Sequence, residues 1–272
     1  MLLGVKLLNG SELAEFIKER QVHQVRALVQ ADGIQPKLAI IVCSNNPVIN
    51  TYVALKQRYG ADISVDVEVH KIDQKEALGL INALNKNHEV HGIIVQLPLA
   101  DTSQTDEIVN AVAPEKDIDA LGKDATLDPA TPMAINWLLA GYNIDVKTKP
   151  IAIVGNGRLV GAPLKRLFEA SNIEVSVVNG DTEHPEDILL HSQIIITAVG
   201  KPNLITSSMI PDKCVVVDAA TTSENGELKG DLADDVYERE DITVTPRKGG
   251  VGPLTVVALF DNVIRAARQT KE

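Results

Sequence analysis

The stretch Ile151-Ala152-Ile153-Val154-Gly155-Asn156-Gly157-Arg158-Leu159-Val160-Gly161 decides the fold of this chain. Its first four residues are all apolar, which predicts a buried strand, and residues 159–170 predict a helix. The loop between them has the pattern GxGxxxG. Glycines let the backbone approach a pyrophosphate, and a helix N-terminus offers unpaired N–H groups and positive potential. A plain tight turn is the alternative, but the position between a strand and a helix favours a dinucleotide-binding unit.

The chain downstream of this loop continues to alternate strands with helices. We expect strands at 174–178, 193–198, 214–218 and 242–244, a helical turn at 185–191 and a long helix at 254–269. This order is typical of a Rossmann-like domain. Asp181 lies about 20 positions beyond Gly161, the spacing at which an acidic residue accepts a hydrogen bond from the ribose 2′-hydroxyl of NAD. A turn aspartate that contacts only water is an equal alternative.

The residues upstream alternate in the same way. We expect helices at 12–30, 47–59, 74–85 and 105–112, and strands at 37–43, 63–69 and 92–97. Residues 114–132 are rich in Pro, Asp and Ala and predict a crossing segment, followed by a helix through Leu139. We therefore predict an α/β chain of two domains with the active site in the cleft between them. An N-terminal catalytic domain would comprise residues 1–120 with 253–272, and a Rossmann-like dinucleotide-binding domain residues 121–252.

The composition disfavours several classes of protein. The 272 residues have a formal net charge of −11, which makes nucleic acid an unsuitable partner. The sequence contains no CxxC, HExxH or histidine cluster that would indicate a metal site, and Cys43 and Cys214 lie in apolar runs that predict buried, reduced thiols. We find no signal peptide, and no apolar run reaches the roughly 20 residues that span a bilayer. We therefore expect a cytoplasmic protein without a membrane partner.

Three groups of polar residues upstream of the glycine loop are suited to catalysis. Tyr52 and Lys56 are four apart on a predicted helix and share a face, where the Tyr hydroxyl could hold the amine and lower its pKa. Gln96 ends a buried strand, where ligands of α/β proteins bind, although it could simply tie down the next loop. Asp117 and Asp119 could be solvated caps, but a carboxylate can also accept two parallel N–H bonds from an amidine-like ligand edge.

Together these motifs resemble the bifunctional methylenetetrahydrofolate dehydrogenase/cyclohydrolase family along nearly the whole chain. The similar segments, in the order found in the family, are Tyr52-Val53-Ala54-Leu55-Lys56, residues 92–99 (GIIVQLPL), residues 116–119 (KDID), residues 129–132 (PATP), residues 160–163 (VGAP), residues 198–202 (AVGKP) and residues 249–255 (GGVGPLT). The resemblance implies oxidation of 5,10-methylenetetrahydrofolate to 5,10-methenyltetrahydrofolate with NAD or NADP, and then hydrolysis to 10-formyltetrahydrofolate. It also implies tetrahydrofolate derivatives as ligands and a homodimer.

The resemblance further implies which residues form the site. The catalytic residues would be Lys56, Tyr52, Gln96 and Asp119. The cofactor-binding residues would be Gly155, Asn156, Gly157, Arg158, Gly161, Asp181 and Thr221. The substrate-binding residues would be Tyr52, Asp119, Pro98, Gly249, Gly250 and Pro253. No residue is assigned to a metal.

This sequence departs from the family mainly on the cofactor side. The arginine and serine of the family's glycine loop are Asn156 and Gly157 here. With Asp181 near the place of a 2′-phosphate, these changes slightly favour NAD over NADP, although Arg158 could replace the missing arginine. Two other functions stay open. One is a cyclohydrolase that has lost its redox activity, and the other is a non-catalytic folate- or nucleotide-binding paralogue.

Overall fold

The computed structural model describes residues 6–44, 46–224 and 227–270. The chain divides into two compact units, and each unit is built from two separate stretches of sequence. Residues 15–130 with 256–272 form what we call the three-stranded unit, and residues 1–14 with 131–255 form the six-stranded unit.

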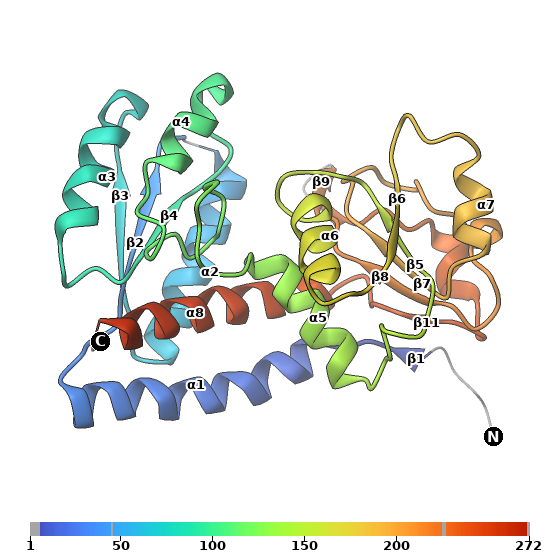
Figure 1. Ribbon diagram of the computed structural model, residues 1–272, viewed down its shortest axis with the longest axis horizontal. Helices are drawn as coiled ribbons and strands as arrows, with labels where there is room; N and C mark the ends of the chain where they lie inside the picture. Colours follow the sequence, from blue (N-terminus) through green and yellow to red (C-terminus); the bar gives the residue numbers. More distant parts are fainter. Residues whose placement is uncertain (1–5, 45, 225–226, 271–272) are drawn as a thin grey trace. The chain divides into compact units, whose positions relative to one another are not determined.

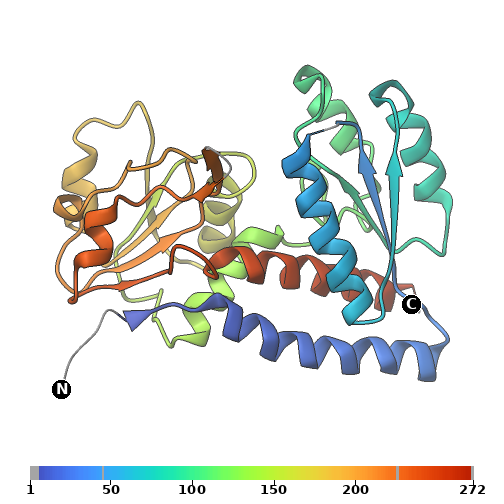
Figure 2. The ribbon, with the colours of Figure 1, turned by 180° about the vertical axis from the view of Figure 1, so that it is seen from behind.

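The three-stranded unit contains a parallel sheet of order β3-β2-β4. Its strands are β2 (Lys37–Val42), β3 (Asp66–Lys71) and β4 (Gly92–Val95). The accompanying helices are α1 (Gly10–Asp32), α2 (Pro47–Asp62), η1 (Gln74–Glu76), α3 (Ala77–Lys86), η2 (Thr102–Gln104), α4 (Thr105–Asn110) and α8 (Val251–Gln269), of which α1 and α8 also extend into the other unit. The strands lie between α2 and α3 in both views of the ribbon (Figure 1, Figure 2).

Both faces of this sheet are buried at β2 and β4, which explains the continuous apolar runs of these two strands. Ile41 and its neighbours on one face belong to a core cluster with Ile81 of α3 and Ile108 of α4. Ile40, which alternates with them, is also fully buried. Three helices of the unit are joined by polar contacts as well. The buried Gln21 of α1 donates to the Val257 carbonyl at 3.0 Å and accepts from the Tyr59 hydroxyl at 2.7 Å.

The six-stranded unit contains a parallel sheet of order β1-β11-β8-β7-β5-β6. Its strands are β1 (Lys6–Leu7), β5 (Ile151–Val154), β6 (Val175–Val178), β7 (Ile194–Thr197), β8 (Val215–Asp218) and β11 (Thr243–Val244). The other elements are α5 (Ala130–Gly141), α6 (Gly161–Ala170), α7 (Pro185–Leu190), η3 (Ser207–Met209), η4 (Asp234–Glu238) and the antiparallel pair β9 (Thr222–Glu224) and β10 (Glu227–Lys229). The strand order reverses at β5, and nucleotides bind beyond the carboxyl ends of strands at such a point.

The predicted fold class, an α/β chain with a Rossmann-like sheet, is confirmed. The division into units differs from the predicted one in three places, the shortest of which is residues 253–255, which belong to the six-stranded unit. Residues 6–14 belong to the six-stranded unit because β1 pairs with β11. Residues 121–130 belong to the three-stranded unit, where the Asp128 carbonyl accepts a hydrogen bond from Asn262 at 2.8 Å. The predicted domains also include residues 1–5 and 271–272, which lie outside the described residues.

Several element boundaries differ from the predicted ones by a few residues, and the start of β3 differs for a local reason. Strand β3 begins at Asp66 and not at residue 63, because α2 continues to Asp62 and ends in a turn. In that turn Ser64 has a φ of 63° and the Val65 N–H donates to the Gly60 carbonyl at 2.8 Å. Helix α6 begins at Gly161 and not at residue 159.

The two cysteines are buried free thiols, as predicted. Within residues 6–44, 46–224 and 227–270, no helix is both long and apolar enough to cross a membrane.

Candidate active site

Lys56 and Gln96 form a hydrogen-bonded pair in the three-stranded unit. Lys56 lies on α2 with its side chain buried, and its Nζ donates to Oε1 of Gln96 at 2.8 Å. Gln96 follows β4, and its backbone N–H donates to the Ile41 carbonyl at 2.9 Å. Its Nε2 donates to the Leu97 carbonyl at 3.2 Å. These bonds fix the side-chain amide so that its oxygen points at the lysine.

The surroundings of Lys56 favour a neutral amine more than water does. Burial lowers the pKa of Lys56, and the negative charge of Asp119 opposes this effect only in part. An amine whose pKa is lowered is neutral in a larger fraction of molecules at neutral pH, and only the neutral form can accept a proton. The structure therefore provides a proton acceptor whose position is fixed by Gln96.

Tyr52 is half-buried on α2, one turn before Lys56. No hydrogen bond joins Tyr52 to Lys56, both of which are among the described residues. The bond expected from the tyrosine hydroxyl is made by the Gln96 amide instead. The helical spacing therefore placed the two side chains on one face correctly but did not identify the partner of the amine.

The paired aspartates have different environments. Asp117 is buried and accepts from the Gly122 N–H at 2.7 Å. Its burial raises its pKa to about 6, although the N–H groups of Ala120, Leu121 and Gly122 favour the charged form. Asp117 thus caps the turn, whereas the half-buried Asp119 interacts electrostatically with Lys56. Asp117 is therefore a buried cap and not the solvated cap considered from the sequence, whereas the ligand role of Asp119 stays a prediction.

Several contacts hold the turn that contains Asp119. The Lys116 carbonyl accepts from the Ile93 N–H of β4 at 2.8 Å. The Lys116 ammonium donates to three carbonyls at the end of α3, those of Leu84, Asn85 and Asn87, at 3.1, 2.9 and 2.7 Å. The buried Asn262 of α8 donates to the Ile118 carbonyl at 2.9 Å. Asp119 is therefore presented by a segment that is fixed on both sides.

The glycine loop of the six-stranded unit is exposed at its centre, and the backbone at each of its ends requires glycine. Gly155 has a φ of 96°, and its N–H donates to the Val178 carbonyl at 2.8 Å. A Cβ on Gly161 would lie 2.0 Å from the Gly155 carbonyl oxygen, so no other residue fits there. Residues 156–159 between them are exposed. The loop therefore offers the backbone cradle that a pyrophosphate requires.

The turn after β6 presents Asp181. Asn179 Oδ1 accepts from the Asp181 N–H at 2.9 Å and from the Thr182 hydroxyl at 3.2 Å, which holds the turn together. Asp181 itself is exposed. Thr221 is also exposed, just beyond the end of β8. The two residues therefore both follow carboxyl ends of strands in the same sheet, where the sequence predicted a cofactor.

The predicted substrate-binding residues are divided between the units. Pro98 is exposed directly after β4, in the three-stranded unit, whereas Gly249, Gly250 and Pro253 belong to the six-stranded unit. Gly249 has a φ of 84°, and its carbonyl accepts from the Ser11 N–H at 3.0 Å. The structure thus shows the backbone at Gly249 fixing the start of α1.

Sequence reasoning missed a set of polar residues at the carboxyl ends of the six-stranded sheet. Thr197, Asp218 and Thr245 end or follow β7, β8 and β11, and the fully buried Asp231 lies among them. The sequence pattern that could have identified them is a polar residue at the end of an apolar strand. The same pattern singled out Gln96. Applied to the second half of the chain, this pattern would have found the first three.

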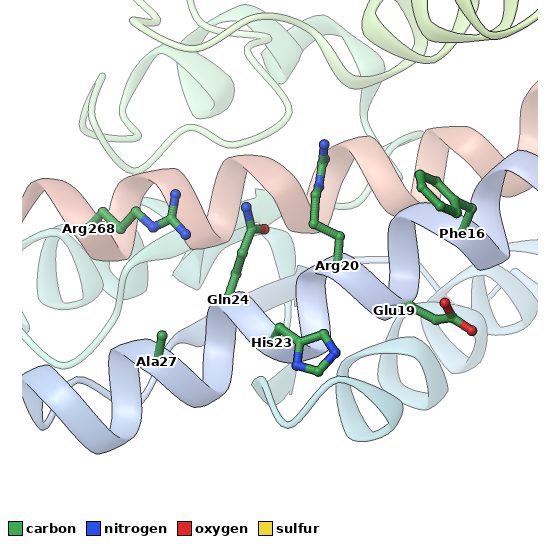
Figure 3. A pocket seen from close by; sticks show the side chains of 7 residues that line it. All are labelled: Phe16, Glu19, Arg20, His23, Gln24, Ala27 and Arg268. Atoms are coloured by element: carbon green, nitrogen blue, oxygen red, sulfur yellow. The ribbon is translucent and has the colours of Figure 1, made fainter.

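A hollow of about 520 Å³ lies on the three-stranded unit. Figure 3 shows its lining, which comprises Phe16, Glu19, Arg20, His23, Gln24 and Ala27 of α1 and Arg268 of α8. No predicted site residue lines it, so we do not regard it as the active site. Within the described part of the chain, no group of three or more His, Cys, Asp or Glu side chains could hold a metal ion.

These features define a class: a two-unit α/β protein with a Rossmann-like nucleotide-binding sheet and a buried lysine–glutamine pair. The comparisons with known proteins specify it further. The family model described as the tetrahydrofolate dehydrogenase/cyclohydrolase catalytic domain matches residues 8–119. The model for the NAD(P)-binding domain of the same family matches residues 129–271. The chain belongs to the tetrahydrofolate dehydrogenase/cyclohydrolase family, which confirms the predicted resemblance.

Individual relatives agree with this assignment. The bifunctional protein FolD of Methanosarcina barkeri is 35% identical over 96% of both chains. The crystal structure of the bifunctional enzyme FolD from Campylobacter jejuni is 31% identical, covers 98% of this chain and 99% of that one, and superposes with a TM-score of 0.92. A Trypanosoma brucei FolD structure, complexed with NADP and an inhibitor, is 25% identical, covers 99% of each chain and has a TM-score of 0.91.

Proposed function

We propose that the chain oxidises 5,10-methylenetetrahydrofolate with NAD(P) and hydrolyses the resulting 5,10-methenyl compound to 10-formyltetrahydrofolate. The observation that supports this most is the buried Lys56 amine held at 2.8 Å from Gln96, with Asp119 close enough to affect its pKa. Burial disfavours a charge on this amine, so a chemical role is the best explanation for a lysine at a buried position.

Hydrolysis is the step that needs a proton acceptor. Water adds to the carbon of the methenyl cation and loses a proton to the neutral Nζ of Lys56. The bond from this carbon to N5 then breaks, and N5 gains a proton while the new hydroxyl loses one to become the formyl oxygen. Gln96 accepts a hydrogen bond from Nζ and so keeps its lone pair directed at the water. Asp119 accepts two parallel N–H bonds from the pterin and orients it, and its charge stabilises the protonated lysine that forms.

Oxidation places different demands on the chain. The dinucleotide supplies a hydride acceptor, and loss of hydride from the methylene carbon leaves a resonance-stabilised cation without proton transfer. The residues need only hold the folate and the dinucleotide in the correct relative orientation, which by itself can substantially lower the activation barrier of hydride transfer. The Gly155–Gly161 loop fits a pyrophosphate because Gly155 has a positive φ and Gly161 leaves no room for a side chain. Tyr52, Pro98, Gly249, Gly250 and Pro253 would contact the folate.

The test is an absorbance assay of methenyl formation and decay, with NAD and NADP supplied separately. We expect both activities in the purified protein. If hydrolysis occurs without oxidation by either dinucleotide, the chain is a cyclohydrolase that has lost its redox activity, an outcome that the replaced loop residues Asn156 and Gly157 would explain. If neither reaction occurs although folate binds, the proposed function is wrong.

We further propose that NAD is used at least as well as NADP. The exposed Asp181 at the end of β6 would repel a 2′-phosphate and could accept the 2′-hydroxyl of NAD. Losing one charge-assisted hydrogen bond costs about 1.5–3 kcal/mol, so the missing loop arginine should weaken NADP by about tenfold or more. The values of kcat/KM for the two cofactors decide this. A clear preference for NADP contradicts the proposal, and its loss on Arg158→Ala would show that Arg158 replaces the missing residue.

A further inference from the structure

Asp231 lies at the centre of the polar residues at the carboxyl ends of β7, β8 and β11. Its side chain is fully buried. Its Oδ2 accepts from the Thr197 hydroxyl at 2.6 Å and from the Val199 N–H at 2.8 Å. Its Oδ1 accepts from the N–H groups of Gly200 and Lys201 at 2.8 and 2.7 Å. One carboxylate therefore holds three consecutive backbone amides directly after β7.

Three consecutive N–H groups that converge on one point form a concavity suited to an anion. The positive φ of Gly200, 82°, produces this geometry. Here the concavity is filled from within by the Asp231 carboxylate, so these amides are not available to a phosphate. The bonds have a charged acceptor and are therefore stronger than neutral ones. The loop 199–201 is consequently held in a single shape.

This loop contacts the glycine loop through Val199. A Cβ placed on Gly155 would lie 2.9 Å from Cγ2 of Val199, so the valine packs directly over the first glycine. Val199 is nevertheless 47% exposed. Its methyl groups form an apolar surface beside the cradle, on the side of β7.

The segment that contains Asp231 is fixed in turn by Asp218, the last residue of β8. Asp218 Oδ2 accepts from the N–H groups of Asp231 and Leu232 at 2.8 and 3.1 Å. A Cβ on Gly230 would lie 2.0 Å from the same oxygen, so glycine is required there. The position of Asp231, and through it that of Val199, therefore depends on two strands of the sheet.

We propose that Asp231 is a positioning residue for dinucleotide binding, which holds loop 199–201 so that Val199 supports the nicotinamide half of the cofactor. The adenosine ribose is expected at the end of β6, and β7 lies on the other side of β5, so Val199 faces the other half of the dinucleotide. An apolar side chain contacts a flat ring without competing for its hydrogen bonds. This inference rests on the proposed use of a dinucleotide.

The test compares two variants of the full chain in titrations with NAD, NADP and ADP. We expect Asp231→Asn to weaken dinucleotide binding about tenfold or more, because the amide NH₂ cannot accept from the backbone N–H groups. Val199→Ala, at an exposed position, should weaken it by about three- to tenfold through the lost methyl contacts. ADP lacks the nicotinamide half, so Val199→Ala should bind it as the wild type does. In the dehydrogenase assay both variants should raise the KM for the dinucleotide more than the KM for the folate.

Asp235→Asn is a matched control, because Asp235 also accepts from a backbone N–H and a hydroxyl, those of Ser207, whereas the described residues show no hydrogen bond from its carboxylate to loop 199–201. It should bind dinucleotide as the wild type does. The inference is overturned if a folded Asp231→Asn binds dinucleotide normally, or if Val199→Ala either changes nothing or weakens ADP equally. Should Asp231→Asn fail to fold, Val199→Ala decides alone. A wild type that binds neither dinucleotide would overturn the proposed oxidation as well, whereas unchanged variants of a binding wild type overturn only this inference.

Discussion

Replacing Lys56 by glutamine removes the basic amine while roughly keeping the length of the side chain. The glutamine amide can still donate to Gln96, which lies 2.8 Å from the native Nζ, but it cannot accept a proton at any accessible pH. Burial already disfavours the charged amine, as its lowered pKa shows, so a neutral replacement should leave the free energy of unfolding unchanged or slightly higher. The variant therefore tests the chemical role of the Lys56 amine without lowering the free energy of unfolding.

Positioned general bases accelerate reactions by about a hundredfold to ten-thousandfold, so Lys56→Gln should lower the kcat of hydrolysis by at least a hundredfold. Oxidation needs no base, and we expect its kcat to fall by less than about tenfold. Disappearance of the methenyl absorbance measures hydrolysis above the spontaneous rate, and its appearance measures oxidation. In the wild type, hydrolysis should slow as the pH falls through the lowered pKa of Lys56, and this dependence should be absent in the variant.

Lys18→Gln is the matched control. Lys18 lies on α1 and forms an ion pair at 2.6 Å with Asp62, the last residue of α2, the helix that contains Lys56. This variant removes a lysine from the surface of the unit and should leave both activities as they are. Hydrolysis by Lys56→Gln at the wild-type rate would refute the role of the amine. Parallel loss of both activities, with a lower unfolding midpoint, would indicate that Lys56 is structural.

Three further variants test other parts of the structure. Gly161→Ala should abolish dinucleotide binding but not hydrolysis, because the added methyl would lie 2.0 Å from the Gly155 oxygen; unchanged NAD(P) affinity in a titration would contradict this. Asn262→Leu should lower the unfolding free energy by about 1–3 kcal/mol in urea, since it leaves the Ile118 carbonyl without its donor. Burial raises the pKa of Asp218 to about 6 from 3.8, so the folded state retains a proton that the unfolded state releases between these values. The stability that Asp218 adds is present below about pH 4 and is lost as the pH rises through about 6, by up to roughly 3 kcal/mol, whereas Asp218→Asn should lack this decline.

The fold was predictable where periodicity is local. Every predicted strand appears, and those buried on both faces, such as residues 37–42, are uninterrupted apolar runs. Strand β1 was missed because its two residues are defined only by pairing with β11, far along the chain. The pair β9 and β10 was missed for the same reason, since neither strand has an apolar face that would mark it. Partners distant in sequence leave no local pattern.

The candidate site was predictable in part. Lys56 and Gln96 were singled out by helix spacing and by strand end, and the structure brings them together. The role of Asp117 could not be predicted, because the sequence shows two carboxylates but not which one accepts from the N–H groups of residues 120–122. Asp231 was missed because the four groups that donate to its carboxylate lie at least 30 positions away, one at the end of β7 and three on a loop that was considered only as a family motif.

The pairing of β1 with β11, together with the return of α8 to the three-stranded unit, makes the two units interleaved along the chain. During synthesis residues 15–130 are made before β5 and the strands that follow it, yet the helix that supplies Asn262 and Val257 to the three-stranded unit is made last. The three-stranded unit is therefore completed after the six-stranded unit, although most of it is synthesised first. The same order limits recombination among relatives, because a single crossover between residues 15 and 255 always exchanges parts of both units. A chimaera that swaps a whole unit needs three crossovers, near residues 14, 130 and 255.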